Sequence, residues 1–249
     1  MEQVRFEIIK NERLTENVFE MKLQGSMVNM PEPGQFVNIA LDGHFLRRPI
    51  SVCHAEPGLL TLVYKVVGSG TEQMASFTRE QQLDVLCGLG RGYDLSKAAD
   101  RPLLVGGGVG VPPLYYLCEK LLEAGKDVTV ILGFNSKSEI FYEKEFKALG
   151  AEVLVSTVDG SYGIRGFVTD AMKDLDYSFF YTCGPMPMLK AVYSCTNTSG
   201  EFSFEERMGC GFGACMGCSC KTVSGTKRIC REGPILTKEE IIWQTPASR

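Results

Sequence analysis

Val105-Gly106-Gly107-Gly108-Val109-Gly110-Val111-Pro112-Pro113 is the stretch of sequence that decides the fold. It joins an apolar run, Leu103-Leu104-Val105, to a predicted helix over 112–124 that Gly125 closes. Such a turn lets a phosphate approach closely, because glycines leave room and a helix start offers free N–H groups. The glycines do not follow G-x-G-x-x-G, so the turn predicts a nucleotide fold related to, but distinct from, the standard FAD/NAD Rossmann domain.

Around this turn, residues 100–199 alternate apolar runs with helical segments. Strands are predicted at 128–132, 153–155 and 179–181, and their apolar character on both faces indicates a parallel sheet covered by helices on both sides. Ser136-Lys137-Ser138-Glu139 predicts a capping box at the start of a helix that ends near Gly150. The tip of the second strand, Gly133-Phe134-Asn135, lacks the acidic residue that usually binds a ribose.

Residues 1–99 have a different pattern. Apolar side chains alternate along runs that begin at Val4, Phe19, Val37 and Leu60, and turn clusters separate these runs. Several short strands at this spacing predict an antiparallel barrel or sandwich. A short helix is expected over 71–77.

The composition narrows the class of protein. The chain has 249 residues, a net charge of −4 and 44% hydrophobic residues, which disfavours both disorder and nucleic-acid binding. The first residues lack the apolar stretch of a signal peptide, and no membrane span is evident, so a cytoplasmic protein without a membrane or nucleic-acid partner is expected. Ten cysteines, five of them from 210 to 230, are then expected to hold a metal rather than to form disulfides.

The cysteine cluster follows a specific spacing. Cys210, Cys215 and Cys218 form C-x4-C-x2-C, and Cys230 follows after eleven residues, which is the plant-type arrangement for a [2Fe–2S] centre. Thiolates are soft donors that suit iron, and interspersed glycines allow backbone N–H groups to point at the sulfurs. Structural zinc and metal-free thiols are the alternatives, although zinc sites usually present two paired knuckles. These four cysteines are the predicted ligands, and Cys220 is a spare thiol.

Three further motifs are typical of sites for phosphates or nucleotides. Arg47-Arg48-Pro49-Ile50-Ser51 offers a bidentate arginine, although a solvated arginine pair would give the same pattern. Gly68-Ser69-Gly70-Thr71 opens the short helix, either as a phosphate site or as a simple cap. Cys183-Gly184-Pro185 ends the last parallel strand, where ligands of open α/β sheets bind, or forms a plain turn.

In this order the motifs resemble those of the ferredoxin–NADP reductase superfamily. The strings RRPIS, VGGGVGVPPLYYL, CGP and CGFGACMGC, followed by CREGP, are similar to the electron transfer subunits of bacterial NAD-dependent dihydroorotate dehydrogenases over essentially the whole chain. The resemblance implies an FAD-binding β-barrel over 1–99, an NAD-binding Rossmann-like α/β domain over 100–199 and a [2Fe–2S] segment over 200–249.

The resemblance also implies residue roles. FAD would lie at Arg48, Pro49, Ile50 and Ser51, beside the strand Val63-Tyr64-Lys65, with a phosphate at Gly70 and Thr71 and the loop 88–92 on the far side of the flavin. The nicotinamide nucleotide would be framed by Gly107, Gly108, Gly110, Cys183, Gly184 and Pro185. No side chain is expected to act as an acid–base catalyst. His44 and His54 are expected at the surface or in packing, and Cys53 and Cys87 as small buried hydrophobes.

The implied path runs from dihydroorotate to FMN in a catalytic partner subunit, then through one [2Fe–2S] cluster and one FAD to NAD+, in de novo pyrimidine (UMP) synthesis. Two copies of each subunit are expected in a heterotetramer. One alternative is the FAD/[2Fe–2S] subunit of another NAD(P)H-linked oxidoreductase, of the ferredoxin:NADP oxidoreductase or sulfhydrogenase type. Another is a non-catalytic, zinc-stapled binding module.

Overall fold

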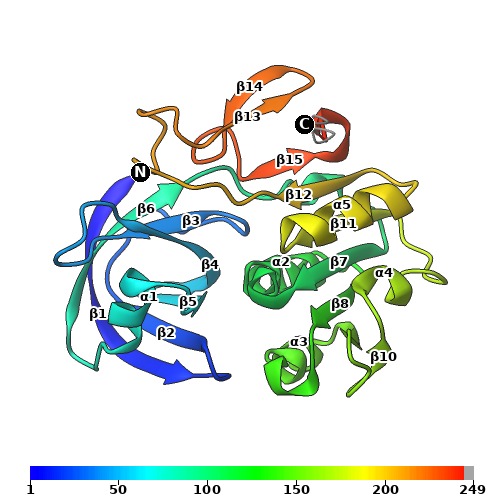
Figure 1. Ribbon diagram of the computed structural model, residues 1–249, viewed down its shortest axis with the longest axis horizontal. Helices are drawn as coiled ribbons and strands as arrows, with labels where there is room; N and C mark the ends of the chain where they lie inside the picture. The colour runs from blue at the N-terminus through cyan, green and yellow to red at the C-terminus, as the bar shows by residue number, and fades with distance from the viewer. Residues whose placement is uncertain (244–249) are drawn as a thin grey trace, which may run out of the picture.

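The chain forms two domains side by side, with a smaller segment lying across both of them (Figure 1). The computed structural model describes residues 1–243; the last six residues of the predicted 200–249 segment lie outside the described residues. Within the described part, no helix combines the length and apolar character that a membrane crossing requires.

The first domain is a closed antiparallel barrel, so the barrel prediction is confirmed and the sandwich alternative is not. Its strand order is β1-β2-β5-β4-β3-β6. The side chains that alternate inward form one apolar cluster, and Met74 of the short helix belongs to that cluster. The helix begins two residues earlier than predicted. The elements are β1(Glu2–Arg13), β2(Val18–Gln24), β3(Phe36–Ile39), β4(Arg48–Glu56), β5(Leu59–Lys65), α1(Ser69–Ala75) and β6(Gln82–Leu89).

The second domain is a sheet in the order β10-β9-β8-β7-β11-β12-β15, parallel except for its last strand. The strand order reverses between β7 and β11, because the connections from these two strands run to opposite sides of the sheet. Open α/β sheets bind their ligands at such a point. This confirms the predicted parallel-sheet nucleotide fold. The strands are β7(Pro102–Gly107), β8(Thr129–Phe134), β9(Glu152–Thr157), β10(Ile164–Arg165), β11(Phe179–Cys183), β12(Gly200–Ser203) and β15(Ile235–Thr237), and the helices are α2(Pro112–Glu123), α3(Glu143–Leu149), α4(Val168–Ala171) and α5(Met186–Cys195).

The predicted capping box is wrong. Residues 137–139 make a single 3-10 turn, and α3 begins only at Glu143. Ser136 makes no capping hydrogen bond: its hydroxyl pairs with that of Ser138 at 2.9 Å, and the Glu139 carboxylate accepts from the side-chain amide of Asn135. The residue before α3, Tyr142, has a left-handed φ of 65°, which separates the turn from the helix.

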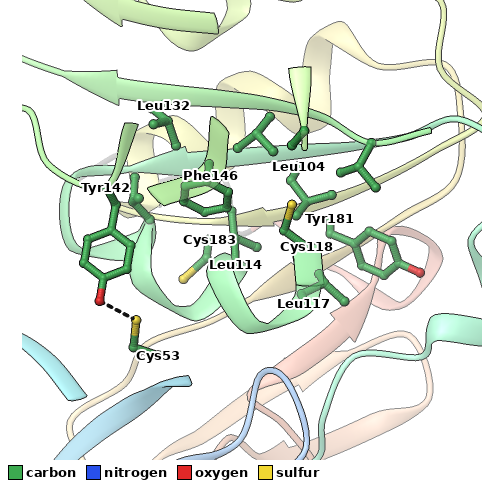
Figure 2. Packing of buried hydrophobic residues seen from close by; sticks show 14 of the residues in the cluster. Cys53, Leu104, Leu114, Leu117, Cys118, Leu132, Tyr142, Phe146, Tyr181 and Cys183 are labelled. Carbon is green, nitrogen blue, oxygen red and sulfur yellow. Dashed lines mark hydrogen bonds between the residues drawn. The ribbon is translucent and has the colours of Figure 1, made fainter. Parts of the chain in front are cut away.

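An apolar cluster joins the barrel to the nucleotide domain. Figure 2 shows Leu114, Leu117 and Cys118 of α2 packed under the sheet, with Cys53 of the barrel at the edge of the group. The Cys53 thiol donates to the Tyr142 hydroxyl at 3.3 Å, and that hydroxyl donates to Glu20 of β2 at 2.7 Å. Cys53 and Cys87 are fully buried, as predicted.

The cysteine-rich segment is attached to both domains. It leaves the sheet after β12, forms the hairpin β13(Ser219–Thr222)–β14(Gly225–Arg228), and returns as β15, which pairs antiparallel with β12. Its buried side chains, including Ile229, share one apolar cluster with Phe36 and Leu89 of the barrel and with the sheet. The segment is therefore folded against its neighbours rather than around a core of its own.

Candidate functional site

Four of the five clustered cysteines come together as two pairs. Cys210 and Cys215, the outer pair, lie on the loop after β12, and Cys215 is exposed. Backbone N–H groups of Ala214 and Cys215 donate to the Cys210 sulfur at 3.2 and 3.4 Å, and that of Cys210 donates to the Cys215 sulfur at 3.4 Å. The loop thus presents N–H groups to sulfur, as the interspersed glycines predict.

Cys218 and Cys230, the inner pair, are both only 2% exposed. They flank the β13–β14 hairpin, and the backbone N–H of Cys230 donates to the Cys218 sulfur at 3.4 Å. The N–H of Ile229 also donates to the carbonyl of Cys218 at 3.1 Å, which closes the base of the hairpin. Strand pairing therefore sets the position of this pair.

One thiol of each pair has a shifted pKa, and the two shifts are in opposite directions. Burial raises the pKa of Cys210, but hydrogen bonds from the backbone N–H groups of Cys215, Phe212 and Ala214 outweigh it and lower the pKa to about 6. Burial, the neighbouring Cys218 and the charge of Cys210 raise the pKa of Cys230 to about 12. Cys210 is thus ready to supply a thiolate, whereas Cys230 needs a bound cation to lose its proton.

This donor set fits a two-iron cluster. Each iron of a [2Fe–2S] centre takes two protein thiolates, so two separate pairs match it better than they match one tetrahedral ion, which needs all four donors together. Within residues 1–243, no three His, Cys, Asp or Glu side chains converge on a point suited to one ion. The fifth cysteine, Cys220, lies on β13 and pairs with Lys227 of β14. It packs against the apolar cluster of the segment, and burial raises the pKa of its thiol.

Asn38 of β3 holds the cysteine loop against the barrel, a role that the sequence analysis missed. Its side-chain Nδ2 donates to the carbonyl of Cys210 at 3.2 Å. Gly211 has a φ of +76°, and a Cβ there would come within 2.3 Å of that nitrogen. Asn38 is 1% exposed, and its Oδ1 has no protein partner among the described residues. The sequence signal that could have revealed this role is a polar asparagine inside the otherwise apolar run 36–39.

Arg228 supports the same loop from the hairpin and was also missed. Its Nη1 donates to the carbonyl of Gly213 at 2.5 Å, and its Nε donates to Glu232 at 2.9 Å. The end of β14 thus braces the loop that carries the outer pair, which lies thirteen or more residues earlier in the sequence.

Two of the predicted flavin motifs meet at α1. A Cβ on Gly70 would fall 2.2 Å from Nε of Arg48, so the guanidinium lies directly on this glycine. His44, expected at the surface or in packing, places Nδ1 2.7 Å from Nη2 of Arg48 and orients it. An arginine held over a glycine at a helix start is a cradle that fits a pyrophosphate.

The side chain of Thr71, a predicted phosphate-binding residue, is engaged in the loop before α1. Its hydroxyl donates to the carbonyl of Gly68 at 2.9 Å and accepts from the backbone N–H of Val67 at 2.9 Å. The hydroxyl of Thr71 therefore shapes the loop before α1. The backbone N–H of Thr71 is the group left to bind a phosphate. Pro49, Ile50 and Ser51 lie on β4, half-buried, and pair with 36–38 of β3.

The predicted strand beside FAD points its side chains in three directions. Tyr64 is buried in the barrel, where its hydroxyl donates to Asn11 at 2.9 Å and burial raises its pKa to about 12. Val63 packs in the interdomain cluster. Lys65 lines a cavity of the nucleotide domain. In the predicted 88–92 loop, a Cβ on Gly90 would meet Pro234 at 2.7 Å, so this loop lies against the cysteine-rich segment.

A cavity of about 530 Å³ opens at the carboxyl ends of β7, β8, β9 and β11, at the point where the strand order reverses. The predicted Gly107, Gly108, Gly110, Gly184 and Pro185 all line it. The two turns touch, because a Cβ on Gly110 would lie 2.2 Å from the carbonyl oxygen of Cys183. The Cys183 side chain is not among the lining groups: it is 1% exposed within the interdomain cluster, where burial raises its pKa to about 12.

Several polar residues of this cavity were not predicted, three of them at or just beyond the ends of β8 and β9. Asn135 and Glu139 line it just beyond β8, and Ser156 lines it at the end of β9. The Ser156 hydroxyl is buried without a protein partner in the described part of the chain. The glycine-rich turn after β7 and the Cys183-Gly184-Pro185 turn, together with these polar groups, form a cavity that fits a dinucleotide.

Known proteins resemble this chain along its whole length. A family model described as the iron–sulfur cluster binding domain of dihydroorotate dehydrogenase B matches residues 205–242, and an oxidoreductase NAD-binding domain matches 104–194. The dihydroorotate dehydrogenase B (NAD(+)) electron transfer subunit of Fusobacterium nucleatum is 45% identical, with 93% of this chain and 95% of that one covered. This chain belongs to that electron transfer subunit family.

Further relatives share the description of the Fusobacterium protein or share the fold. The dihydroorotate dehydrogenase B (NAD(+)) electron transfer subunit of Shouchella clausii is 42% identical, over 96% of this chain and 98% of that one. Among solved structures, that of an NADH-dependent reduced ferredoxin–NADP oxidoreductase superposes with a TM-score of 0.88 at 32% identity, over 96% of this chain and 90% of that one. The Amycolatopsis cytochrome P450 reductase GcoB shares the fold, with a TM-score of 0.70 at 18% identity over 78% of this chain and 65% of that one.

Proposed function

We propose that the chain is the electron transfer subunit of an NAD-dependent dihydroorotate dehydrogenase. It passes electrons from an FMN-containing catalytic subunit through a [2Fe–2S] cluster and FAD to NAD+, for the synthesis of UMP. The relatives carry this name, and the donor set and the two-domain fold fit the same task. The overall reaction turns dihydroorotate and NAD+ into orotate, NADH and a proton.

One observation carries the proposal. Asn38, which holds the carbonyl of Cys210, pairs in the barrel with Pro49 of the flavin motif. The loop that carries the outer pair is therefore held by the strand next to the proposed flavin site, because β3 and β4 lie one strand spacing, about 4.8 Å, apart. FAD, when bound, exchanges hydride with a nicotinamide and single electrons with an iron–sulfur cluster, which is the chemistry that such proximity serves.

The residues divide the work of binding and orientation. Arg48 and Gly70 would hold the pyrophosphate of FAD, with the backbone of Thr71, and Pro49, Ile50 and Ser51 would lie along the flavin. The backbone of Val63, Tyr64 and Lys65 would run beside it. Gly107, Gly108, Gly110, Gly184 and Pro185 would receive NAD(H), with Cys183 behind them as packing. Cys210, Cys215, Cys218 and Cys230 would be the cluster ligands. None of these groups is required to move a proton as a catalyst.

The catalytic partner would dock near the outer pair. Phe212 and Met216, which alternate with the cysteines of that loop, are 43% and 53% exposed. Exposed apolar side chains around a thiolate pair suit a surface that a second subunit covers. We propose an assembly of two copies of each subunit, working in the cytoplasm, where disulfides are rare and free thiols persist.

Co-expression with an FMN-containing dihydroorotate dehydrogenase subunit tests the proposal. Anaerobically purified complex should contain FAD, FMN, iron and sulfide, and should reduce NAD+ with dihydroorotate. The chain alone should oxidise NADH with an artificial acceptor but should not use dihydroorotate. A colourless chain that contains zinc, or NAD+ reduction by dihydroorotate without the partner, would overturn it.

A second candidate is favoured by the structure of the NADH-dependent reduced ferredoxin–NADP oxidoreductase, whose fold matches closely at 32% identity. In that case the chain would be the FAD/[2Fe–2S] subunit of a ferredoxin-linked enzyme. Reduced ferredoxin would then support NADP+ reduction by the complex, and dihydroorotate would not support NAD+ reduction. The two assays on the same purified complex separate the candidates.

A further inference from the structure

We propose that the Tyr142 hydroxyl fixes the nucleotide domain on the barrel and thereby positions the nicotinamide for hydride transfer to or from FAD. The inference rests on the proposed function, because it takes the barrel as the FAD site and the cavity of the sheet as the NAD(H) site. Hydride transfer needs the two reacting atoms within about 3.5 Å of each other, so the relative position of the domains is part of the chemistry. Tyr142 is a positioning residue in this proposal, because it acts through the placement of the domains.

The Tyr142 hydroxyl contacts the strands on both sides of β5. It donates to Oε2 of Glu20 on β2 at 2.7 Å, and it accepts from the thiol of Cys53 on β4 at 3.3 Å. In the barrel β5 lies between β2 and β4, and Glu20 pairs directly with Val63 of β5. Val63 belongs to the strand proposed to run beside FAD, and β4 carries the proposed flavin motif. The hydroxyl therefore bridges the two strands that flank the proposed flavin strand.

The backbone that carries Tyr142 leads directly to the nucleotide cavity. Asn135 and Glu139 line that cavity, and the same short segment ends at Tyr142, one residue before α3. Tyr142 has a left-handed φ of 65°, which a residue other than glycine keeps only where its surroundings hold it. Figure 2 shows its ring reaching away from the sheet toward Cys53 of the barrel. One segment thus joins the wall of the cavity to the barrel.

The contact is buried and charged. Glu20 is 8% exposed, and its Oε1 accepts from Lys10 at 2.9 Å. Burial raises the pKa of Glu20, but hydrogen bonds from Tyr142 and Lys10 outweigh it and lower the pKa, so the carboxylate is charged at neutral pH. The apolar cluster between the domains resists their separation but has no preferred direction. A short hydrogen bond to a charged group fixes both distance and direction, so it restricts sliding of one domain over the other.

Alkylation of Cys53 in the FAD- and cluster-loaded full chain measures how often this interface opens. Cys53 is fully buried, so iodoacetamide reaches it only when the domains separate locally. Tyr142→Phe removes the hydrogen bond to the charged Glu20 and should raise the labelling rate roughly tenfold, followed by peptide mass mapping. Tyr162→Phe is the matched control, because the Tyr162 hydroxyl also donates to a carboxylate, that of Glu143 at 3.0 Å, but within one domain. It should label at the wild-type rate.

Anaerobic stopped-flow reduction of the bound FAD by NADH gives the second readout. In this step a hydride leaves NADH and joins FAD, so that NAD+ and FADH− are formed. At saturating NADH, Tyr142→Phe should slow the step roughly tenfold, while the dissociation constant for NADH changes by less than about twofold, because the groups that bind the nucleotide are untouched. Glu20→Gln keeps an acceptor but loses the charge, so it should lie between wild type and Tyr142→Phe. Tyr162→Phe should match wild type.

The outcomes separate the two proposals. Faster labelling of Cys53 together with slower flavin reduction, strongest in Tyr142→Phe and weaker in Glu20→Gln, supports the inference. Flavin reduction at the wild-type rate in Tyr142→Phe, or unchanged labelling of Cys53, would overturn it and leave the proposed function standing. If Tyr142→Phe does not retain FAD, the same two measurements on Glu20→Gln decide. Wild-type protein whose FAD is not reduced by NADH would instead overturn the proposed function, and the role of Tyr142 with it.

Discussion

The outer and inner cysteine pairs differ in what fixes their position and in how they are exposed. Cys218 and Cys230 are fixed by a hairpin inside a core shared with the barrel, whereas Cys210 and Cys215 lie on a surface loop shaped by left-handed glycines. The inner pair has its position set before any metal arrives, but burial makes the Cys230 thiol reluctant to ionise. In the outer pair, the Cys210 thiol ionises readily, and the loop relies on Asn38 and Arg228 for its position. A cluster site can thus combine one pair of ligands that the fold holds in place with a second pair, on a surface loop, that contains the more acidic thiol.

Cysteine replacements test this division most directly. Cys215→Ala and Cys230→Ala should each abolish the cluster completely, measured as iron and sulfide per chain and as the EPR signal after dithionite reduction. Only Cys230→Ala should also destabilise the iron-free protein, by about 1 kcal/mol, because it removes a buried sulfur. Chemical denaturation of the iron-free variants measures this difference.

Cys220→Ser is the matched control for those replacements, because it changes a thiol of the same segment outside the two pairs. It should keep a full complement of iron. Loss of the cluster in Cys220→Ser, or equal stability of the two iron-free alanine variants, would contradict the division into pairs.

Alkylation of the iron-free protein compares the pairs by reactivity. Because the pKa of Cys210 is lowered to about 6, its thiol is largely ionised at pH 7, and only about one-tenth is ionised at pH 5, so iodoacetamide should label it roughly tenfold more slowly at pH 5. Cys230, with a pKa raised to about 12 and 2% exposure, should react only after unfolding. Peptide mass mapping gives both rates, and faster labelling of Cys230 than of Cys210 would refute the comparison.

Two glycines of the cysteine loop test how far the outer pair depends on backbone shape. Gly213 has a φ of +93°, and a Cβ there would lie 2.6 Å from Cδ of Arg231, so Gly213→Ala should cost about 1–2 kcal/mol of loop stability. Its cluster should bleach several-fold faster in air. A Cβ on Gly217 would meet only the Cys215 sulfur, at 3.5 Å, so Gly217→Ala should bleach at nearly the wild-type rate. Equal rates for the two variants would show that the loop shape is unimportant.

Asn38→Ala should have the smallest effect. It removes one hydrogen bond to the outer pair, worth about 1 kcal/mol, and so should release iron to a chelator about fivefold faster. Asn29→Ala, at an exposed asparagine of the barrel, is the control. Unchanged release from Asn38→Ala would mean that the barrel does not hold the loop.

Local pattern predicted much of this molecule. Strand alternation, the glycine-rich turn after β7 and the cysteine spacing depend on neighbours in sequence, so the barrel, the parallel sheet and the grouping of cysteines could be expected. The contact from Asn38 to Cys210 joins residues 172 apart in sequence, and no local period encodes it. The same holds for Lys65, which reaches the nucleotide cavity from the far domain.

At the predicted capping box, a local hydrogen bond that the sequence pattern did not consider prevents the expected helix start. Ser136 and Glu139 have the right spacing for a helix start, but Asn135 offers the carboxylate two short amide contacts within the same turn. The helix is delayed to Glu143, and the freed segment turns toward the cavity. Tyr64 is a similar case: its strand was placed correctly, but the side of the barrel on which each side chain lies depends on the closed sheet.

The antiparallel pairing of β12 with β15 also bears on how this protein could have been inherited. Because the cysteine-rich segment leaves the nucleotide sheet by one edge strand and re-enters it by the next, it is an insertion closed at both ends and not an appended tail. A genetic exchange that moved the cluster alone would have to carry β15 with it and leave β12 as an unprotected edge. A nucleotide domain without the cluster would therefore need another way to cover the edge of β12.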